Sequence, residues 1–239
     1  MRPAQVIGIL LLICLLVVGA VTVFVNARWF MADAYTRYAE KQWRWFDARK
    51  SAREAAALAF KFMPYNARAL KSEAVSDLFS GSKAQALREY EQALHLAPAD
   101  AYLWRDYALA LVYTGNIDDR LEHVVRQAQL LAPRSVPLHE SLAYAGLKVY
   151  TQSDRKLQAF WLISIRLAYP TAWNNLLLAA TRSGQELLLC NEVIPHPGHN
   201  PYSGHNPWCV QARWHHGLCP HARGYQDCTV PDAVSSKRK

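Results

Sequence analysis

The sequence predicts an all-α protein, with an N-terminal transmembrane helix, a solenoid of about four helix hairpins and an irregular C-terminal tail. Three observations support this fold class: an uncharged apolar block near the N-terminus, prolines that recur about every 35 residues, and an abrupt change of composition after about Val193. We expect the membrane helix at residues 6–25, the repeats at 33–184 and the tail at 185–239.

The predicted membrane helix runs from Val6 to Val25, twenty residues without a charged side chain. At a rise of about 1.5 Å per residue it spans about 30 Å, the thickness of the hydrocarbon core of a bilayer. Trp29 and Phe30 come directly after it, where interfacial aromatic residues are expected. The alternative is a cleaved signal peptide, whose apolar region is usually about 7–15 residues long. Because this block is longer, we expect a retained signal anchor.

The orientation in the membrane is set by two opposing effects. Arg2 precedes the span, and several basic residues come after it: Arg28, Arg37, Lys41 and Arg44. This bias of Lys and Arg favours a cytoplasmic domain. Yet long C-terminal domains often translocate despite nearby charge, and an anchor with a very short leading tail commonly exports the domain attached to it. We expect a single-pass protein of the inner (plasma) membrane with a periplasmic or extracytoplasmic domain.

Four prolines reveal the organisation of the central region: Pro64, Pro98, Pro133 and Pro170, separated by 34, 35 and 37 residues. Each proline closes a segment with helical apolar periodicity. A period near 34 with a terminal proline is typical of a helical solenoid. The alternative is a generic helical bundle, which shows the same 3.6-residue periodicity but not the regular prolines.

The unit at residues 67–100 carries the most specific pattern. Gly81 lies where a turn between two helices is needed. The second helix then places two small residues and one aromatic on one face, at Ala86, Tyr90 and Ala93. This unit resembles the tetratricopeptide repeat, and the resemblance extends over about residues 33–184.

The next unit agrees with the same pattern, and the units around it match less fully. Its packing positions and turn are Trp104, Tyr107, Ala108, Leu111, Gly115, Asn116, Ala128 and Pro133. The outer units contribute Ala52, Ala56, Ala59, Leu142, Ala143, Gly146, Leu162, Ile165, Trp173, Leu176, Leu177, Ala180 and Gly184. The first helix of the N-terminal unit lacks the small residues, so we expect it to continue the membrane helix and cap the array.

The resemblance implies a concave surface, lined by the first helix of each hairpin, that binds a peptide or a partner protein. Carried over residue by residue, the groove positions are Arg68, Lys71, Val75, Tyr102, Arg105, Leu109, Tyr113, Glu140, Tyr144 and Lys148. Tyrosine supplies rigid amphipathic area and the cations pair with carboxylates. An acidic or C-terminal peptide is the expected ligand, since three of the cations would share one face. The alternative is that these residues form a solvated face or pack between repeats.

The net charge of +8, from 27 Lys and Arg against 19 Asp and Glu, fits several kinds of partner. Nucleic acid, an anionic membrane surface and an acidic protein are all compatible with it. The basic residues are scattered, with no long run before Lys237. A membrane-proximal domain also gains from basic residues near anionic lipid. We therefore expect a membrane and a protein partner, and no nucleic acid.

The tail is rich in proline, histidine and cysteine, which leaves three interpretations open. Cys190, Cys209, Cys219 and Cys228 can form two disulfides in three connectivities. A zinc site from Cys209, Cys219, Cys228, His215 and His221 is a weaker alternative, because structural zinc sites usually have ligands only a few residues apart. In the third interpretation the cysteines have no shared role. We expect no bound cofactor.

The sequence lacks the motifs that would indicate an enzyme. There is no glycine-rich phosphate loop, no Gly-x-Ser-x-Gly segment and no His-Glu-x-x-His pair. After His139 and Glu140, Ala143 stands where the second histidine would be, and Asp118 and Asp119 fit a helix cap. A Cys219–His221 pair is too close in sequence to face correctly.

The pattern therefore favours a membrane-anchored scaffold in a cell-envelope assembly, such as polysaccharide, secretion or pilus biogenesis. A metal-binding or redox-responsive membrane regulator that uses the His/Cys-rich tail is the alternative.

Overall fold

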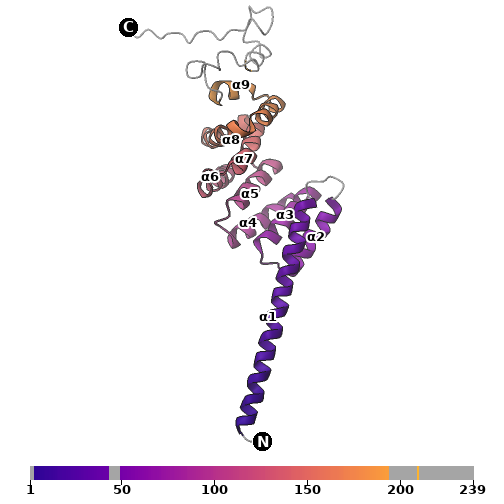
Figure 1. Ribbon diagram of the computed structural model, residues 1–239. Helices are drawn as coiled ribbons and strands as arrows, with labels where there is room; N and C mark the ends of the chain where they lie inside the picture. Colours follow the sequence, from indigo (N-terminus) through magenta and orange to yellow (C-terminus); the bar gives the residue numbers. More distant parts are fainter. Residues whose placement is uncertain (1–2, 43–48, 194–208, 210–239) are drawn as a thin grey trace, which may run out of the picture. The chain divides into compact units, whose positions relative to one another are not determined.

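The computed structural model describes residues 3–42, 49–193 and 209, and secondary structure in this part is helical throughout (Figure 1). This confirms the all-α prediction. The helices are α1 (Pro3–Gln42), α2 (Arg49–Phe62), α3 (Ala67–Ser80), α4 (Lys83–Leu96), α5 (Ala101–Thr114), α6 (Asp119–Leu131), α7 (Val136–Val149) and α8 (Arg155–Ser183), and then the short α9 (Glu186–Leu188). Two further short turns of helix are η2 (Tyr150–Gln152) and η3 (Leu189–Val193).

The chain forms two compact units, one through Ala110 and one from Leu111 onward. The first contains α1 to α4 and most of α5. The second contains the end of α5 and all later helices.

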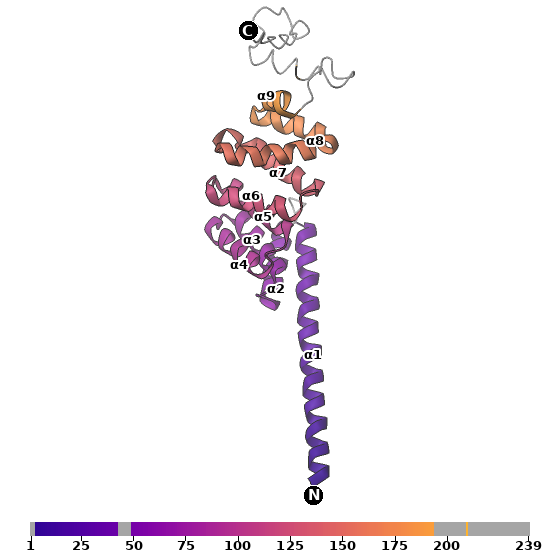
Figure 2. The ribbon, with the colours of Figure 1, turned by 90° about the vertical axis from the view of Figure 1, so that its left-hand side faces the viewer.

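Helix α1 is a single helix of 40 residues that carries the apolar block and then enters the first hairpin (Figures 1 and 2). It is long and apolar enough to cross a bilayer, and the side chains from Leu10 to Val25 are exposed. Its second half packs along α2. The expected continuation of the apolar helix into the first hairpin is thus confirmed.

The packing face of α1 corrects one expectation from the sequence. We expected no small residues on this helix, but Ala32, Thr36 and Ala39 are its buried positions, each at most 2% exposed. Their spacings of four and three residues place them on one helix face. They begin just before the residue at which we expected the repeats to start.

Alanines on the partner helices complete the cores of the first two hairpins. Ala52, Ala56 and Ala59 on α2 are fully buried. On α4, the fully buried Ala86 and Ala93 flank Tyr90, whose ring stacks on Tyr107 at a centroid distance of 5.8 Å. Small residues let the helix axes approach, and the aromatic ring fills the space toward the next helix.

Side chains cap the starts of four helices. Asn66, Asp100, Asp118 and Asp154 accept hydrogen bonds from the first free backbone N–H groups of α3, α5, α6 and α8. Each satisfies donors that lack a partner within the helix.

Left-handed glycines close three helices at the turns that the sequence predicted. Gly81, Gly115 and Gly184 have φ of 94°, 83° and 67°, a region that other residues rarely adopt. They come directly after α3, α5 and α8. In the predicted pattern such a glycine follows the first helix of a repeat, so α3, α5 and the last part of α8 each correspond to a first helix.

The four periodic prolines fall at the boundaries between hairpins. Pro64, Pro98 and Pro133 each stand two residues after the last residue of a helix. Pro170 lies inside α8, where Ala172 leaves the helical region with φ −117° and ψ 19°. Helix α8 is therefore two helices joined at a kink: the partner of α7, and one further first helix.

Helical structure continues beyond the expected start of the tail at residue 185. Helix α9 and η3 pack against α8, with Leu189 fully buried and Cys190 only 4% exposed. Arg166 donates to the Glu192 carbonyl at 3.1 Å. Residues 186–193 thus cover the end of the last helix, and the rest of the expected tail, except Cys209, lies outside the described residues.

Candidate functional site

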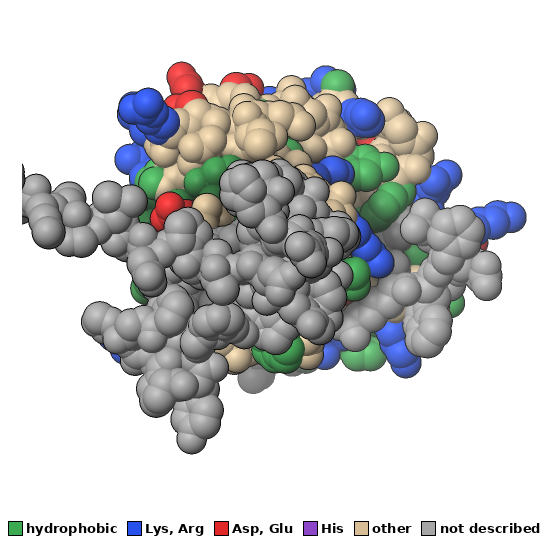
Figure 3. Space-filling view, turned by 90° about the horizontal axis from the view of Figure 1, so that it is seen from above, with side chains coloured by type: hydrophobic (Ala, Val, Ile, Leu, Met, Phe, Trp, Pro, Cys, Tyr) green, Lys and Arg blue, Asp and Glu red, His purple; other side chains and the backbone are tan. Residues whose placement is uncertain are grey.

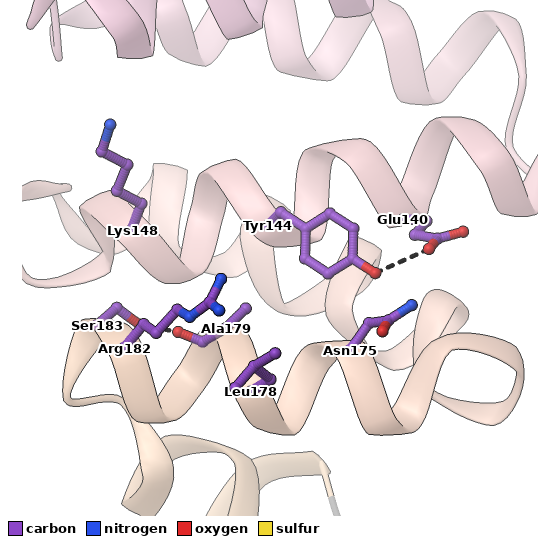
Figure 4. A pocket seen from close by; sticks show the side chains of 8 residues that line it. All are labelled: Glu140, Tyr144, Lys148, Asn175, Leu178, Ala179, Arg182 and Ser183. Atoms are coloured by element: carbon purple, nitrogen blue, oxygen red, sulfur yellow. Dashed lines mark hydrogen bonds between the residues drawn. The ribbon is translucent and has the colours of Figure 1, made fainter. Parts of the chain in front are cut away.

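A cavity of about 680 Å³ lies between α7 and the second part of α8 in the second unit (Figure 4). Helix α7 contributes Glu140, Tyr144 and Lys148, spaced four residues apart on one face. The part of α8 that comes after the kink at Ala172 contributes Asn175, Leu178, Ala179, Arg182 and Ser183. The cavity is therefore formed by the first helices of two successive repeats, both within the second compact unit.

The two ends of this cavity differ in charge. Lys148 and Arg182 lie at one end, and in the part of the chain that the structure describes neither makes an ion pair. At the other end the Tyr144 hydroxyl donates to Glu140 at 2.8 Å, opposite Asn175. Leu178 is half exposed and lies between the ends. The cavity thus offers two cations, an apolar contact and an amide to a ligand.

Tyr144 stays a neutral hydrogen-bond donor over the physiological range. Burial and the neighbouring Glu140 carboxylate raise the pKa of Tyr144 to about 12, while the Asn175 side chain opposes the shift. The hydroxyl therefore holds Glu140 in place at the rim.

Three of the ten groove residues proposed from the sequence line this cavity: Glu140, Tyr144 and Lys148. Six others lie in the first unit: Arg68, Lys71, Val75, Tyr102, Arg105 and Leu109. The last, Tyr113, belongs to the second unit and is half exposed near the end of α5, outside the residues that line the cavity.

The three basic groove residues of the first unit belong to a network of ion pairs. Arg68 reaches Asp33 and Glu40 on α1, at 3.1 Å and 2.9 Å. Lys71 bridges Glu40 and Asp106, both at 3.4 Å. Each contact joins different helices, so the network ties α1, α3 and α5 together.

Arg105 closes the network within α5. Its guanidinium pairs with Asp106 at 2.5 Å and lies 4.9 Å from the centre of the Tyr102 ring. Arg68, Lys71 and Arg105 thus belong to one network, in which each has a carboxylate partner. An acidic ligand would have to compete with Asp33, Glu40 and Asp106, so the first unit gives little support to such a ligand.

The sequence reasoning missed the α8 side of the cavity, although the repeat contains the signal. One period of 34 residues carries Tyr144 to Leu178 and Lys148 to Arg182. The groove positions predicted from the sequence end on α7, because the last first helix is not followed by a second helix in the repeat pattern.

The buried His139 and Ser164 form a polar network that only superficially suggests catalysis. The His139 Nδ1 atom lies 3.1 Å from the Ser164 hydroxyl, and its Nε2 lies 3.1 Å from the Pro133 carbonyl. Since that carbonyl only accepts, Nε2 donates and Nδ1 accepts from Ser164. Gln129 also donates to Ser164, at 2.8 Å. Both members of the pair are at most 1% exposed, so a substrate cannot reach them.

A disulfide joins Cys190 in η3 to Cys209. Cys219, Cys228, His215 and His221 lie outside the described residues. Within residues 3–42, 49–193 and 209, no group of three or more His, Cys, Asp or Glu side chains has the arrangement of a metal site.

Lys and Arg side chains are visible at several places on the face shown in Figure 3, among hydrophobic and other side chains.

The comparisons with known proteins identify the fold. The structure resembles the solved structure reported in a functional characterisation of Pseudomonas aeruginosa PilF, a protein with tetratricopeptide repeats. The TM-score is 0.52 at 17% sequence identity, and the match covers 84% of this chain and 97% of that one. No protein-family model matches this chain, and no curated protein matches it either. The class defined by the fold is thus a tetratricopeptide-like α-solenoid.

Proposed function

We propose that this protein is a membrane-anchored tetratricopeptide-like scaffold that binds a partner protein through the cavity between α7 and α8. The observation that carries the proposal is the pair of cations, Lys148 and Arg182, which lack carboxylate partners among the described residues and lie beside an exposed leucine. Both cations are exposed, and a cation without a carboxylate partner gains more from an incoming carboxylate than one already paired.

The proposed ligand is a peptide segment with a carboxylate, from an acidic side chain or a C-terminus. The carboxylate pairs with Lys148 and Arg182, an apolar side chain packs on Leu178, and Asn175 bonds to the peptide backbone. The cavity volume lies within the range of about 300–1,000 Å³ typical of specific ligand sites.

The proposed setting is a cell-envelope assembly for polysaccharide, secretion or pilus biogenesis, with α1 as a retained anchor in the inner membrane. The length and apolar surface of α1 support the anchor. The Cys190–Cys209 disulfide supports an extracytoplasmic position for the repeats, because disulfides persist in oxidising compartments.

Site-specific photocrosslinking in cells tests the binding site. A benzoylphenylalanine placed at Leu178, inside the cavity, should crosslink to a partner. The same residue at Leu130, which is exposed on α6 outside the cavity, serves as the control. Equal crosslinking at the two positions, or none at Leu178, contradicts the proposal.

Charge reversal tests the chemistry of recognition. The double variant Lys148→Glu/Arg182→Glu should weaken the Leu178 crosslink at least tenfold, which corresponds to about 1.4 kcal/mol. The matched control is Arg155→Glu/Lys156→Glu, the same charge change at exposed positions at the start of α8. If both variants reduce the crosslink equally, the effect comes from net charge and not from the cavity.

A further inference from the structure

The turn between α2 and α3, residues 63–66, is held beside the part of α1 that comes after the apolar block. Arg28 is the first charged residue after that block, and it donates to the Phe62 carbonyl at 2.7 Å. On the other side of the turn, Arg68 pairs with Asp33 at 3.1 Å. Arg68 also pairs with Glu40, at 2.9 Å, further along α1. The turn therefore lies beside the part of α1 that contains Arg28 and Asp33, on the side of Glu40 nearer to the apolar block.

These positions can be converted into depth in a bilayer. Arg28 is three residues beyond Val25, or about 4–5 Å along the helix axis, and Asp33 is about 12 Å beyond it. The headgroup layer on each side of the hydrocarbon core is about 5–7 Å thick. With residues 6–25 in the core, the start of the turn lies within the headgroup layer and its end just above it.

The side chains at this level suit a membrane interface. Tyr65, in the turn, is 83% exposed, the highest value among the large apolar and aromatic residues described. Trp29 and Phe30 on α1 are 52% and 73% exposed at the same level. Lys61, at the end of α2, is exposed and makes no ion pair with another described residue. Tyrosine and tryptophan favour the interface because one end is apolar and the other polar, and lysine is attracted to anionic lipid.

We propose that the 63–66 turn inserts Tyr65 into the headgroup layer of the bilayer that holds α1. The first unit is then fixed to the membrane at two points, the anchor helix and this turn. Since α1 continues without a break to Gln42, both contacts belong to one packed body. This inference rests on the proposed membrane anchor.

The test uses the full-length protein reconstituted in phosphatidylcholine/phosphatidylglycerol vesicles. An environment-sensitive fluorescent amino acid is placed at Tyr65 or, as the matched control, at Ala84. Ala84 is exposed at the opposite end of the α3–α4 hairpin, about 20 Å away along the helices. Incorporation of a fluorescent amino acid avoids labelling the cysteines.

Phosphatidylcholine with a nitroxide on its headgroup should quench the probe at position 65 several-fold more strongly than the probe at position 84. Iodide in the water should show the reverse order. Equal quenching at the two positions overturns the inference.

Alkaline carbonate extraction of the same vesicles separates this inference from the anchor on which it rests. If carbonate releases the protein, the anchor is wrong and the turn contact fails with it. If the protein is retained while position 65 is quenched no more than position 84, only the turn contact is overturned.

Discussion

Gly146 on α7 lies so close to Trp161 on α8 that no side chain fits between them. A Cβ atom built at Gly146 would lie 2.8 Å from Cγ and Cδ2 of the indole. Trp161 is fully buried, and its indole N–H donates to the Ser153 hydroxyl at 3.0 Å. The ring is thus held from both sides and cannot easily move away.

Gly146→Ala should therefore destabilise the protein. Overpacking of a well-filled core typically costs about 1–3 kcal/mol. Urea unfolding monitored by circular dichroism measures the change. In an ordinary helix the same substitution stabilises by roughly 0.5–1 kcal/mol, so a stabilised variant would show that the indole yields.

His139 should make stability depend on pH. Burial lowers the pKa of His139 below its usual value, against the opposing effect of its backbone hydrogen bonds. The unfolded state then binds the proton more readily, so the contribution of His139 is complete above about pH 6.5 and declines as the pH falls below it. The free energy of unfolding of the wild type should decrease over this window.

The variant His139→Gln should lose this part of the pH dependence and be less stable at pH 7, by about 1–3 kcal/mol, because its buried partners lose a bond. His123→Gln, at a site on α6 outside the buried network, is the control and should keep the wild-type profile. Identical pH profiles for all three proteins would contradict the assignment.

Glu73 should make the protein less stable as the pH rises, which is the opposite of the effect expected from His139. Burial, with Glu89 on α4 and Asp77 on α3 nearby, raises the pKa of Glu73 to about 7. Its Oε2 and the Oε2 of Glu89 are both buried and lack a hydrogen-bond partner among the described residues. Arg53 on α2 offsets the charge at Asp77. A raised acid pKa means that folding becomes less favourable as pH rises from about 4.5 through about 7.

Glu73→Gln should therefore raise the thermal midpoint at pH 8 and change it little at pH 5. Glu54→Gln removes one charge from an exposed position on α2 and should leave both values unchanged. An equal stabilisation at the two pH values would assign the effect to packing and not to the proton.

The repeat architecture was predictable from the sequence because it depends on local signals. Glycines at turns and prolines between hairpins act on the residues next to them, and Gly81 and Pro98 are found where the pattern placed them. The pairing of charges was not predictable. Arg68 meets Asp33 and Glu40 only because hairpin packing brings α1 beside α3. A periodic pattern identifies an exposed face, but it does not say which charge lies opposite.

The Cys190–Cys209 disulfide should stabilise the C-terminal end of the second unit. It joins η3, where Cys190 is buried against the end of α8, to a residue 19 positions later. Closing a loop of this length restricts the unfolded chain by about 3 kcal/mol in the chain-entropy estimate. Reductant should therefore lower the thermal midpoint of the wild type.

The cysteine variants assign that effect to this bond. The thermal midpoint of Cys190→Ser/Cys209→Ser without reductant should equal that of the reduced wild type. Reductant should not lower it further through loss of this bond. Cys14→Ser changes the exposed cysteine of α1 and should respond as the wild type does. If the double variant keeps the wild-type midpoint in the absence of reductant, the bond does not hold η3 in place. The packing of η3 on α8 then depends on noncovalent contacts, among them the buried Leu189 and the Arg166–Glu192 pair.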